Sequence, residues 1–105
     1  MTDGKKYKVI VSDRAKRMLG IHIRFMAQVN KQAASAKKNE IMTAMRSLSQ
    51  LPQRFPFFEE LHITPNKYHK MFIEKWYLVL YQIQDDTVYV EYILDCRKDY
   101  SHLIR

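Results

Sequence analysis

Three runs of apolar residues in the second half of the chain alternate with polar residues as strands do. They cover Tyr68–Glu74, Tyr77–Ile83 and Thr87–Asp95. In Tyr77–Ile83 both alternating sets are largely apolar, which is typical of a central strand covered on both faces. Asp85 and Asp86 separate the last two runs and indicate a hairpin turn, because Asp tolerates the left-handed backbone that such turns use. We therefore predict three consecutive antiparallel strands.

The last run, Thr87–Asp95, follows a period of two from end to end. Successive side chains of a strand point to opposite faces of the sheet. The alternation therefore predicts one apolar face, formed by Val88, Val90, Tyr92 and Leu94, and an opposite face formed by Tyr89, Glu91, Ile93 and Asp95.

The first half of the chain has the spacing of two amphipathic helices after a short strand at Tyr7–Val11. Ser12 is a good N-cap for the first helix, whose predicted buried stripe consists of Ala15, Met18, Leu19, His22, Phe25, Met26 and Val29. We interpret His22 as a core residue. The second helix is predicted from about Ala33 to Leu51, where Pro52 ends it, and its stripe consists of Ala34, Ile41, Ala44, Met45 and Leu48.

These elements predict an α+β fold with the order β-α-α-β-β-β. The first strand joins an antiparallel sheet, and the helical hairpin packs on one face of it. A chain of 105 residues has room for one core, so residues 1–105 are expected to form a single domain. The long irregular segment before the sheet carries a cluster that we interpret as a hydrophobic plug, formed by Phe55, Phe57, Phe58 and Leu61.

The charge of the chain is concentrated in its helical half. Residues 1–54 carry 12 Lys and Arg against 3 Asp and Glu, a net +9, whereas residues 55–105 carry 6 against 8, a net −2, which together give the formal +7. Such a face suits an acidic partner or a nucleic-acid backbone, although a solvated helix surface accounts for much of it. No stretch approaches the roughly 20 apolar residues of a membrane span, and the N-terminus lacks the apolar core of a signal peptide, so we expect a cytoplasmic protein. The single Cys96 forms no internal disulfide, and the sequence has no spacing typical of a Cys/His metal site.

The segment that follows the last strand has the most specific motif, Asp95-Cys96-Arg97-Lys98-Asp99-Tyr100. Together with the two preceding strands it resembles the C-terminal half of toxins of the RelE/ParE superfamily from bacterial toxin-antitoxin pairs. That family commonly has a His-Arg-Arg-x-Asp-Tyr-like segment here, so Arg97, Asp99 and Tyr100 match, while Asp95 stands in place of the His. Family members also often have an Arg where this chain has Leu78.

The resemblance implies a toxin that arrests growth, and in its enzymatic members metal-independent cleavage of messenger RNA in the ribosome, with no cofactor. That reaction needs an acid, a base and cations for the phosphate. The expected catalytic residues are Arg97, Tyr100, Asp95 and Glu59, and the expected RNA- and phosphate-binding residues are Lys67, Lys70 and Lys75. Of these, only Arg97 and Tyr100 match the family's motif. An ion pair of Arg97 with Asp95 or Asp99 is the alternative for that residue.

A second class of function stays open, because ParE-type members poison DNA gyrase and lack the nuclease residues. The absence of the His at Asp95 and of the Arg at Leu78 suits that alternative, as does the slightly acidic sheet half. A degenerate toxin that only binds its antitoxin is a third. The predicted partners are therefore a cognate antitoxin, and either the ribosome with messenger RNA or DNA gyrase, with a homodimer left open.

Overall fold

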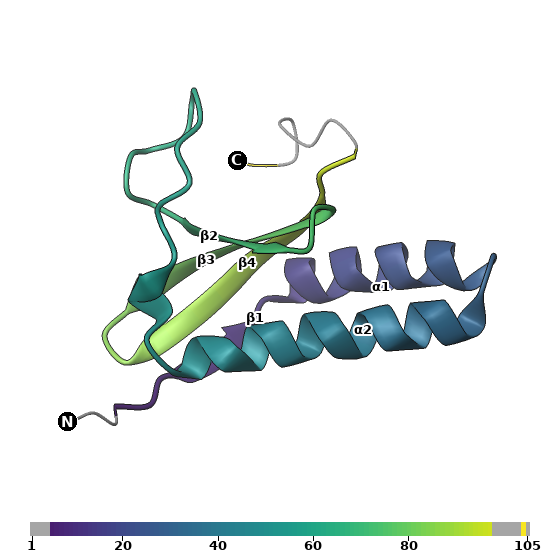
Figure 1. The fold of residues 1–105 in the computed structure, drawn as a ribbon. Coiled ribbons are helices and arrows are strands. Elements are labelled where there is room, and N and C mark those ends of the chain that lie inside the picture. The colour runs from purple at the N-terminus through teal and green to yellow at the C-terminus, as the bar shows by residue number, and fades with distance from the viewer. Residues whose placement is uncertain (1–4, 98–103, 105) are drawn as a thin grey trace.

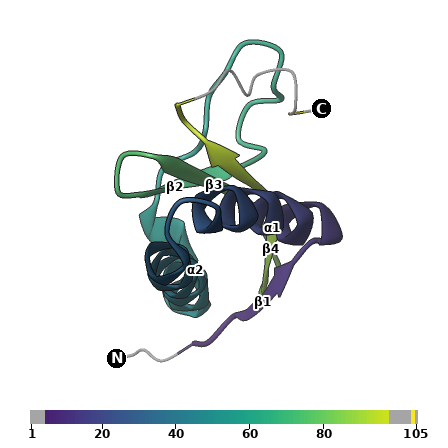
Figure 2. The ribbon, with the colours of Figure 1, turned by 90° about the vertical axis from the view of Figure 1, so that its right-hand side faces the viewer.

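The computed structural model describes residues 5–97 and 104 of the chain, and it shows a four-stranded sheet with two helices. In chain order the elements are β1 (Lys8–Val11), α1 (Asp13–Ala27), α2 (Lys31–Arg46), β2 (His69–Ile73), β3 (Tyr77–Gln84) and β4 (Thr87–Asp95). Two short 3₁₀ turns, Ser47–Ser49 and Pro52–Arg54, follow α2. Figure 1 shows the helices side by side along one side of the sheet, and Figure 2 shows the same arrangement end-on.

The strands lie in the order β1-β4-β3-β2. The pairs β2–β3 and β3–β4 are antiparallel, as the sequence predicts. The pair β1–β4 is parallel; the sequence predicts that the first strand joins this sheet, and the structure adds its direction. The helical hairpin explains this parallel direction, because it returns the chain to the end of the sheet at which β1 begins.

A β-bulge in β4 changes which side chains face the helices. Tyr81 pairs with Val90 while its neighbour Leu80 pairs with Tyr92, so Glu91 is the extra residue. The backbone N–H of Ser12 donates to the Val90 carbonyl at 2.9 Å, and the Ser12 hydroxyl donates to the Glu91 carbonyl at 3.3 Å. The first residue before α1 is thereby bonded to the bulge.

The predicted alternation of β4 is therefore wrong beyond Val90. Val88, Val90 and Ile93 pack in the core under the helices, whereas Tyr92 and Leu94 pack on the opposite face of the sheet. Asp95, which pairs with Tyr77, lies on the helix-facing side. An extra residue shifts the period of two by one position, so every side chain after it changes face.

Both helices begin at side-chain caps. The Ser12 hydroxyl accepts from the N–H of Ala15 at 3.0 Å, and the Asn30 side chain accepts from the N–H of Ala33 at 3.0 Å. The second cap moves the start of α2 to Lys31, two residues before the predicted start, and α2 ends at Arg46, well before Pro52. Among the described residues no helix is long and apolar enough to cross a membrane.

Apolar layers cover both faces of β3, in which five consecutive residues, Tyr77–Tyr81, are at most 1% exposed. Under the helices the core contains, from α1 and α2, the side chains of Ala15, Leu19, Ile41 and Met45. The predicted stripe of α1 is wrong at Phe25 and Val29, which are 63% and 88% exposed. These two residues lie near the end of α1, beyond the part that packs on the sheet.

The opposite face of the sheet is covered by the chain segment before β2. Phe58 and Tyr68 pack there on Leu78 and Leu80. The predicted plug is therefore formed by Phe58 alone of its four residues: Phe55 packs against the core under the helices, Phe57 is 40% exposed, and Leu61 is 83% exposed.

We predict that Tyr81→Phe lowers the free energy of unfolding by about 1–2 kcal/mol. The Tyr81 hydroxyl donates to the buried Pro52 carbonyl at 2.6 Å, and burial raises the pKa of Tyr81 to about 12. The change leaves that carbonyl without its donor. Urea denaturation measures the loss, with Tyr89→Phe as the control, since the Tyr89 hydroxyl has no hydrogen bond among the described residues. Equal stability of the two variants would contradict the prediction.

Candidate functional site

The candidate site lies at the end of the sheet where β4 stops, and an ion pair forms its centre. The guanidinium of Arg97 donates from Nε to Oδ1 of Asp95 at 3.0 Å and from Nη2 to Oδ2 at 2.9 Å. The Arg97 backbone N–H also donates to Oδ1 at 2.9 Å. The Asp95 side chain is 6% exposed and that of Arg97 is 48% exposed. The parallel two-bond geometry holds the guanidinium in a fixed plane.

This ion pair determines the protonation of the site. Burial alone raises the pKa of Asp95, but the hydrogen bonds and charge of Arg97 outweigh it and hold the pKa below the usual range of a carboxyl group. The hydrogen bond to Asp95 raises the pKa of Arg97 in turn. Asp95 is therefore ionised near neutral pH and Arg97 balances its charge. Asp95 is then a poor proton donor, and the pair as a whole has little net charge to offer a phosphate.

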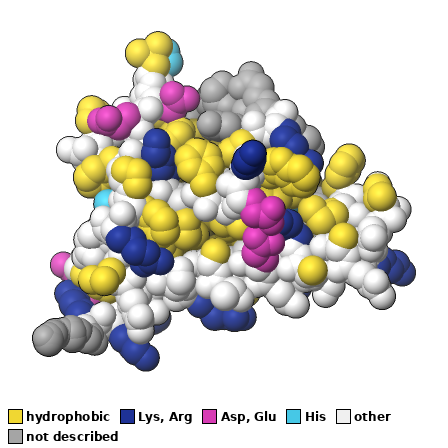
Figure 3. Space-filling model, viewed as in Figure 1, with side chains coloured by type: hydrophobic (Ala, Val, Ile, Leu, Met, Phe, Trp, Pro, Cys, Tyr) yellow, Lys and Arg dark blue, Asp and Glu magenta, His cyan; other side chains and the backbone are white. Residues whose placement is uncertain are grey.

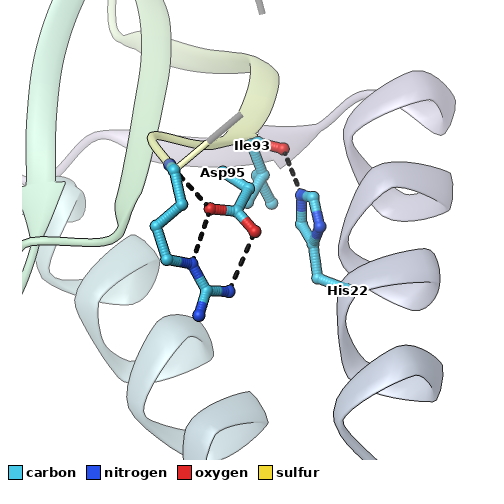
Figure 4. A network of polar contacts seen from close by, with 4 residues as sticks. His22, Ile93 and Asp95 are labelled. Carbon is cyan, nitrogen blue, oxygen red and sulfur yellow. Dashed lines mark hydrogen bonds and ion pairs between the residues drawn. The ribbon is translucent and has the colours of Figure 1, made fainter. Parts of the chain in front are cut away.

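Two aromatic residues and a histidine enclose the ion pair. The Arg97 guanidinium lies 4.6 Å from the ring centre of Trp76, a cation–π contact. His22 of α1 approaches the Ile93 carbonyl with Nε2 at 2.9 Å and lies 5.4 Å from the ring of Tyr77. Figure 4 shows His22 reaching from α1 toward the strand that carries Ile93 and Asp95.

An apolar surface adjoins this ion pair. A cavity of about 290 Å³ lies between α1 and the sheet end, and besides the residues already named it is lined by Ile21, Phe25, Met26 and Val29. Ile21, Phe25, Val29 and Trp76 all expose much of their side chains; we call these four residues the toe surface. Figure 3 shows hydrophobic side chains gathered where the sheet end meets α1. Large apolar side chains that cluster at an open surface mark an interaction site.

The structure does not bring the predicted catalytic and phosphate-binding residues together. Lys75 lies in the turn between β2 and β3 and precedes Trp76, whose ring the Arg97 guanidinium contacts. Lys70 pairs with Leu80 and lies on the sheet face opposite to Asp95. Exposed Glu59 and Lys67 belong to the segment before β2, at the other end of that strand. The five residues of β2, His69–Ile73, alone span roughly 13 Å. Tyr100 lies outside the described residues.

The sequence reasoning missed the residues around the ion pair. The sequence analysis interprets His22 as a core residue, places Phe25 and Val29 in the buried stripe, and gives no role to Trp76. One signal was available: Ile21, Phe25 and Val29 recur every four residues and, as a second stripe, lie beside the one that packs on the sheet. Among the described residues no three His, Cys, Asp or Glu side chains form a cluster that could hold a metal ion.

Comparison with known proteins identifies the family. Residues 9–100 match the family model described as the ParE toxin of the type II toxin-antitoxin system, parDE. Since this match spans most of the chain, the protein belongs to the ParE toxin family and is the toxin of a type II toxin-antitoxin system. The prediction of the RelE/ParE superfamily is thereby confirmed, and membership implies an antitoxin partner.

A solved structure shows the same fold. It is described as the chromosomal ParDE TA system from P. aeruginosa, and it superimposes with a TM-score of 0.71 over 88% of this chain and 98% of that chain, at 11% sequence identity. A likeness at so low an identity concerns the fold, and it confirms the predicted α+β architecture. A search of curated protein sequences finds no significant match.

We predict that Asp95→Asn lowers the free energy of unfolding by about 1–2 kcal/mol at pH 7. A carboxyl group whose folded pKa is depressed stabilises the fold above its ordinary pKa, and this stabilisation is lost as the pH falls through the folded value. The difference between wild type and variant is therefore full above about pH 5 and shrinks below about pH 4. Urea denaturation across this range measures it. Asp86→Asn, at an exposed turn position, is the control; a difference that stays constant with pH would contradict the assignment.

Proposed function

We propose that this toxin arrests growth by binding DNA gyrase in the cytoplasm, as ParE-type members of the superfamily do, and that it has no nuclease activity. The observation that carries the proposal is the ion pair of Arg97 with Asp95. A ribonuclease needs a free cation for the phosphate and a carboxyl group or another base for the 2′-hydroxyl. Here the cation and the carboxylate satisfy each other.

The toe surface supports the same proposal. RNA offers phosphates and base edges, and a site that recognises it combines cations with aromatic stacking platforms. The toe surface instead offers aliphatic and aromatic side chains around one neutralised arginine. Trp and Arg residues that become buried on binding dominate the binding energy of many protein–protein interfaces. Trp76 and Arg97 are residues of these two types, and their contact already holds them in one conformation.

Cleavage of messenger RNA on the ribosome is the second candidate function, and one observation favours it. The Arg97 side chain is 48% exposed, and only Nε and Nη2 bond Asp95. The third guanidinium nitrogen, Nη1, makes no bond to Asp95 and can donate to a phosphate oxygen. In this alternative Arg97 keeps the role expected from the sequence, together with Lys75 and Tyr100, whereas Glu59, Lys67 and Lys70 would need to act from another part of the surface.

The test compares gyrase supercoiling with cleavage on programmed ribosomes, using the wild type and Trp76→Ala. We expect the wild type to inhibit supercoiling without cleaving messenger RNA, and Trp76→Ala to need at least about tenfold more protein for the same inhibition. Phe72→Ala is the matched control, because Phe72 is an exposed aromatic residue on the sheet face away from the helices, and it should inhibit like the wild type.

Three results would overturn the proposal. Cleavage by the wild type that is lost in Arg97→Ala assigns the nuclease function. Equal loss of supercoiling inhibition in Trp76→Ala and Phe72→Ala removes the toe surface from gyrase binding. A wild type that binds its antitoxin but affects neither assay nor growth is a degenerate toxin.

A further inference from the structure

The turn that carries Trp76 is bonded to α2. It connects β2 with β3 and consists of Glu74, Lys75 and Trp76. Lys37, near the middle of α2, donates from Nζ to Oε1 of Glu74 and also, at 2.8 Å, to Oε1 of Glu40. Figure 2 shows the turn between β2 and β3 on the side of the molecule where α2 lies. The ammonium group of Lys37 therefore links the helical layer to a turn of the sheet.

Lys37 differs from the other two lysines of α2 in its burial. Its side chain is 13% exposed, whereas Lys31 and Lys38 are exposed residues. Burial lowers the pKa of Lys37, but the hydrogen bonds and charges of Glu40 and Glu74 outweigh this effect and raise it. The hydrogen bond from Lys37 lowers the pKa of Glu74 in turn. Both groups of the Lys37–Glu74 pair are therefore ionised near neutral pH.

The backbone of the turn explains why such a link is needed. Glu74 has a φ of 54°, in the left-handed region that glycine and asparagine adopt more readily than glutamate does. A residue stays in this region when its surroundings hold it there, and the bond to Lys37 does so. At the other end of the turn, the Trp76 carbonyl accepts from the N–H of Cys96 at 2.7 Å. The turn is thus held by α2 at its first residue and by β4 at its last.

Lys37 acts on the candidate site from outside it. Trp76 lies two residues after Glu74, and its ring is the one that the Arg97 guanidinium contacts. The Trp76 side chain is 45% exposed, so burial alone does not fix it. Burial raises the pKa of Tyr77, and the positive charges of Arg97 and Lys37 oppose this rise. The charge of Lys37 therefore reaches the site, although the residue lies outside the cavity lining.

We propose that Lys37 is a positioning residue of the toxic site, which through Glu74 holds Trp76 in the orientation that packs on Arg97. The inference rests on the proposed function and identifies a residue beyond the toe surface that determines the affinity of that surface. Without the ammonium group, Glu74 leaves the left-handed region more readily and the turn samples other conformations. The target must then order Trp76 when it binds, and this ordering weakens the affinity.

The experiment uses Lys37→Met, which removes the ammonium group and keeps a straight side chain that suits a helix. Trp76 is the only tryptophan of the chain, so its fluorescence reports on this turn alone. We expect acrylamide to quench the folded variant about twofold more strongly than the wild type, because the turn opens locally. The variant should also need roughly 3- to 10-fold more protein to inhibit gyrase, as expected when one large side chain must be ordered on binding.

Two controls remove one charge each close to Lys37. Lys38→Met changes the net charge equally at the neighbouring exposed position. Glu40→Gln removes the other partner of Lys37 and leaves the bond to Glu74 in place. Both controls should match the wild type in quenching and in gyrase inhibition, if Lys37 acts through the turn.

A rescue variant tests the path through the backbone of the turn. In Lys37→Met/Glu74→Asn the ion pair is absent, but asparagine adopts the left-handed conformation more readily than glutamate. We therefore expect this double variant to recover most of the shielding of Trp76 and most of the gyrase inhibition. A general loss of stability in Lys37→Met would leave the quenching of the folded protein unchanged, and urea denaturation measures that loss separately.

Failure of this proposal and failure of the proposed function give different results. If Lys37→Met is quenched like the wild type, or if either control changes as much, Lys37 does not position Trp76. If quenching rises while toxicity stays the same, the turn moves but is no part of the toxic site, and the proposal is wrong. If the wild type does not act on gyrase, the proposed function fails. The quenching results are independent of the target, and growth arrest on induced expression then replaces the supercoiling assay, with the same order of variants expected.

Discussion

The β-bulge at Glu91 is the local constraint on which the rest of this structure depends. It exposes the carbonyls of Val90 and Glu91 to Ser12, and the bonds to Ser12 fix where α1 begins. It also turns the last part of β4, so that Asp95 faces α1 and not the opposite layer. Without the extra residue, Ile93 and Asp95 would change places with Tyr92 and Leu94, and a carboxylate would enter the apolar layer around Phe58 and Tyr68.

The placement of Asp95 in turn explains the conformation of Arg97. A carboxylate with 6% exposure requires a charged partner, because an isolated ion in this position is strongly unfavourable. Arg97, two residues on, is a cation that reaches it with two parallel bonds, and its guanidinium lies over the ring of Trp76. The pairing makes Arg97 a rigid planar cation whose charge is balanced by Asp95. Such a group suits a protein interface better than a phosphate clamp, which must meet growing negative charge with free positive charge.

Local patterns predicted much of this fold, and long-range pairing explains the parts that they missed. The bounds of β4 and the cap at Ser12 follow from short-range signals and agree with the structure. The bulge does not, because a glutamate in an alternating strand looks the same whether or not it is an extra residue. The parallel pairing of β1 depends on where the hairpin delivers the chain, which no local pattern encodes.

The candidate site was predictable to a similar extent. The pair of Arg97 with Asp95 is local in sequence and was foreseen as an alternative. Lys70 is expected at the site because it is near the other candidates in the sequence. Its position in the alternation of β2, however, places it on the face of the sheet opposite to Asp95. Phe25 and Val29 have the spacing of core residues, and periodicity alone cannot distinguish a side chain that packs on the sheet from one on a helix end that extends past it. Helix length relative to the sheet decides this, and it is a property of the assembled fold.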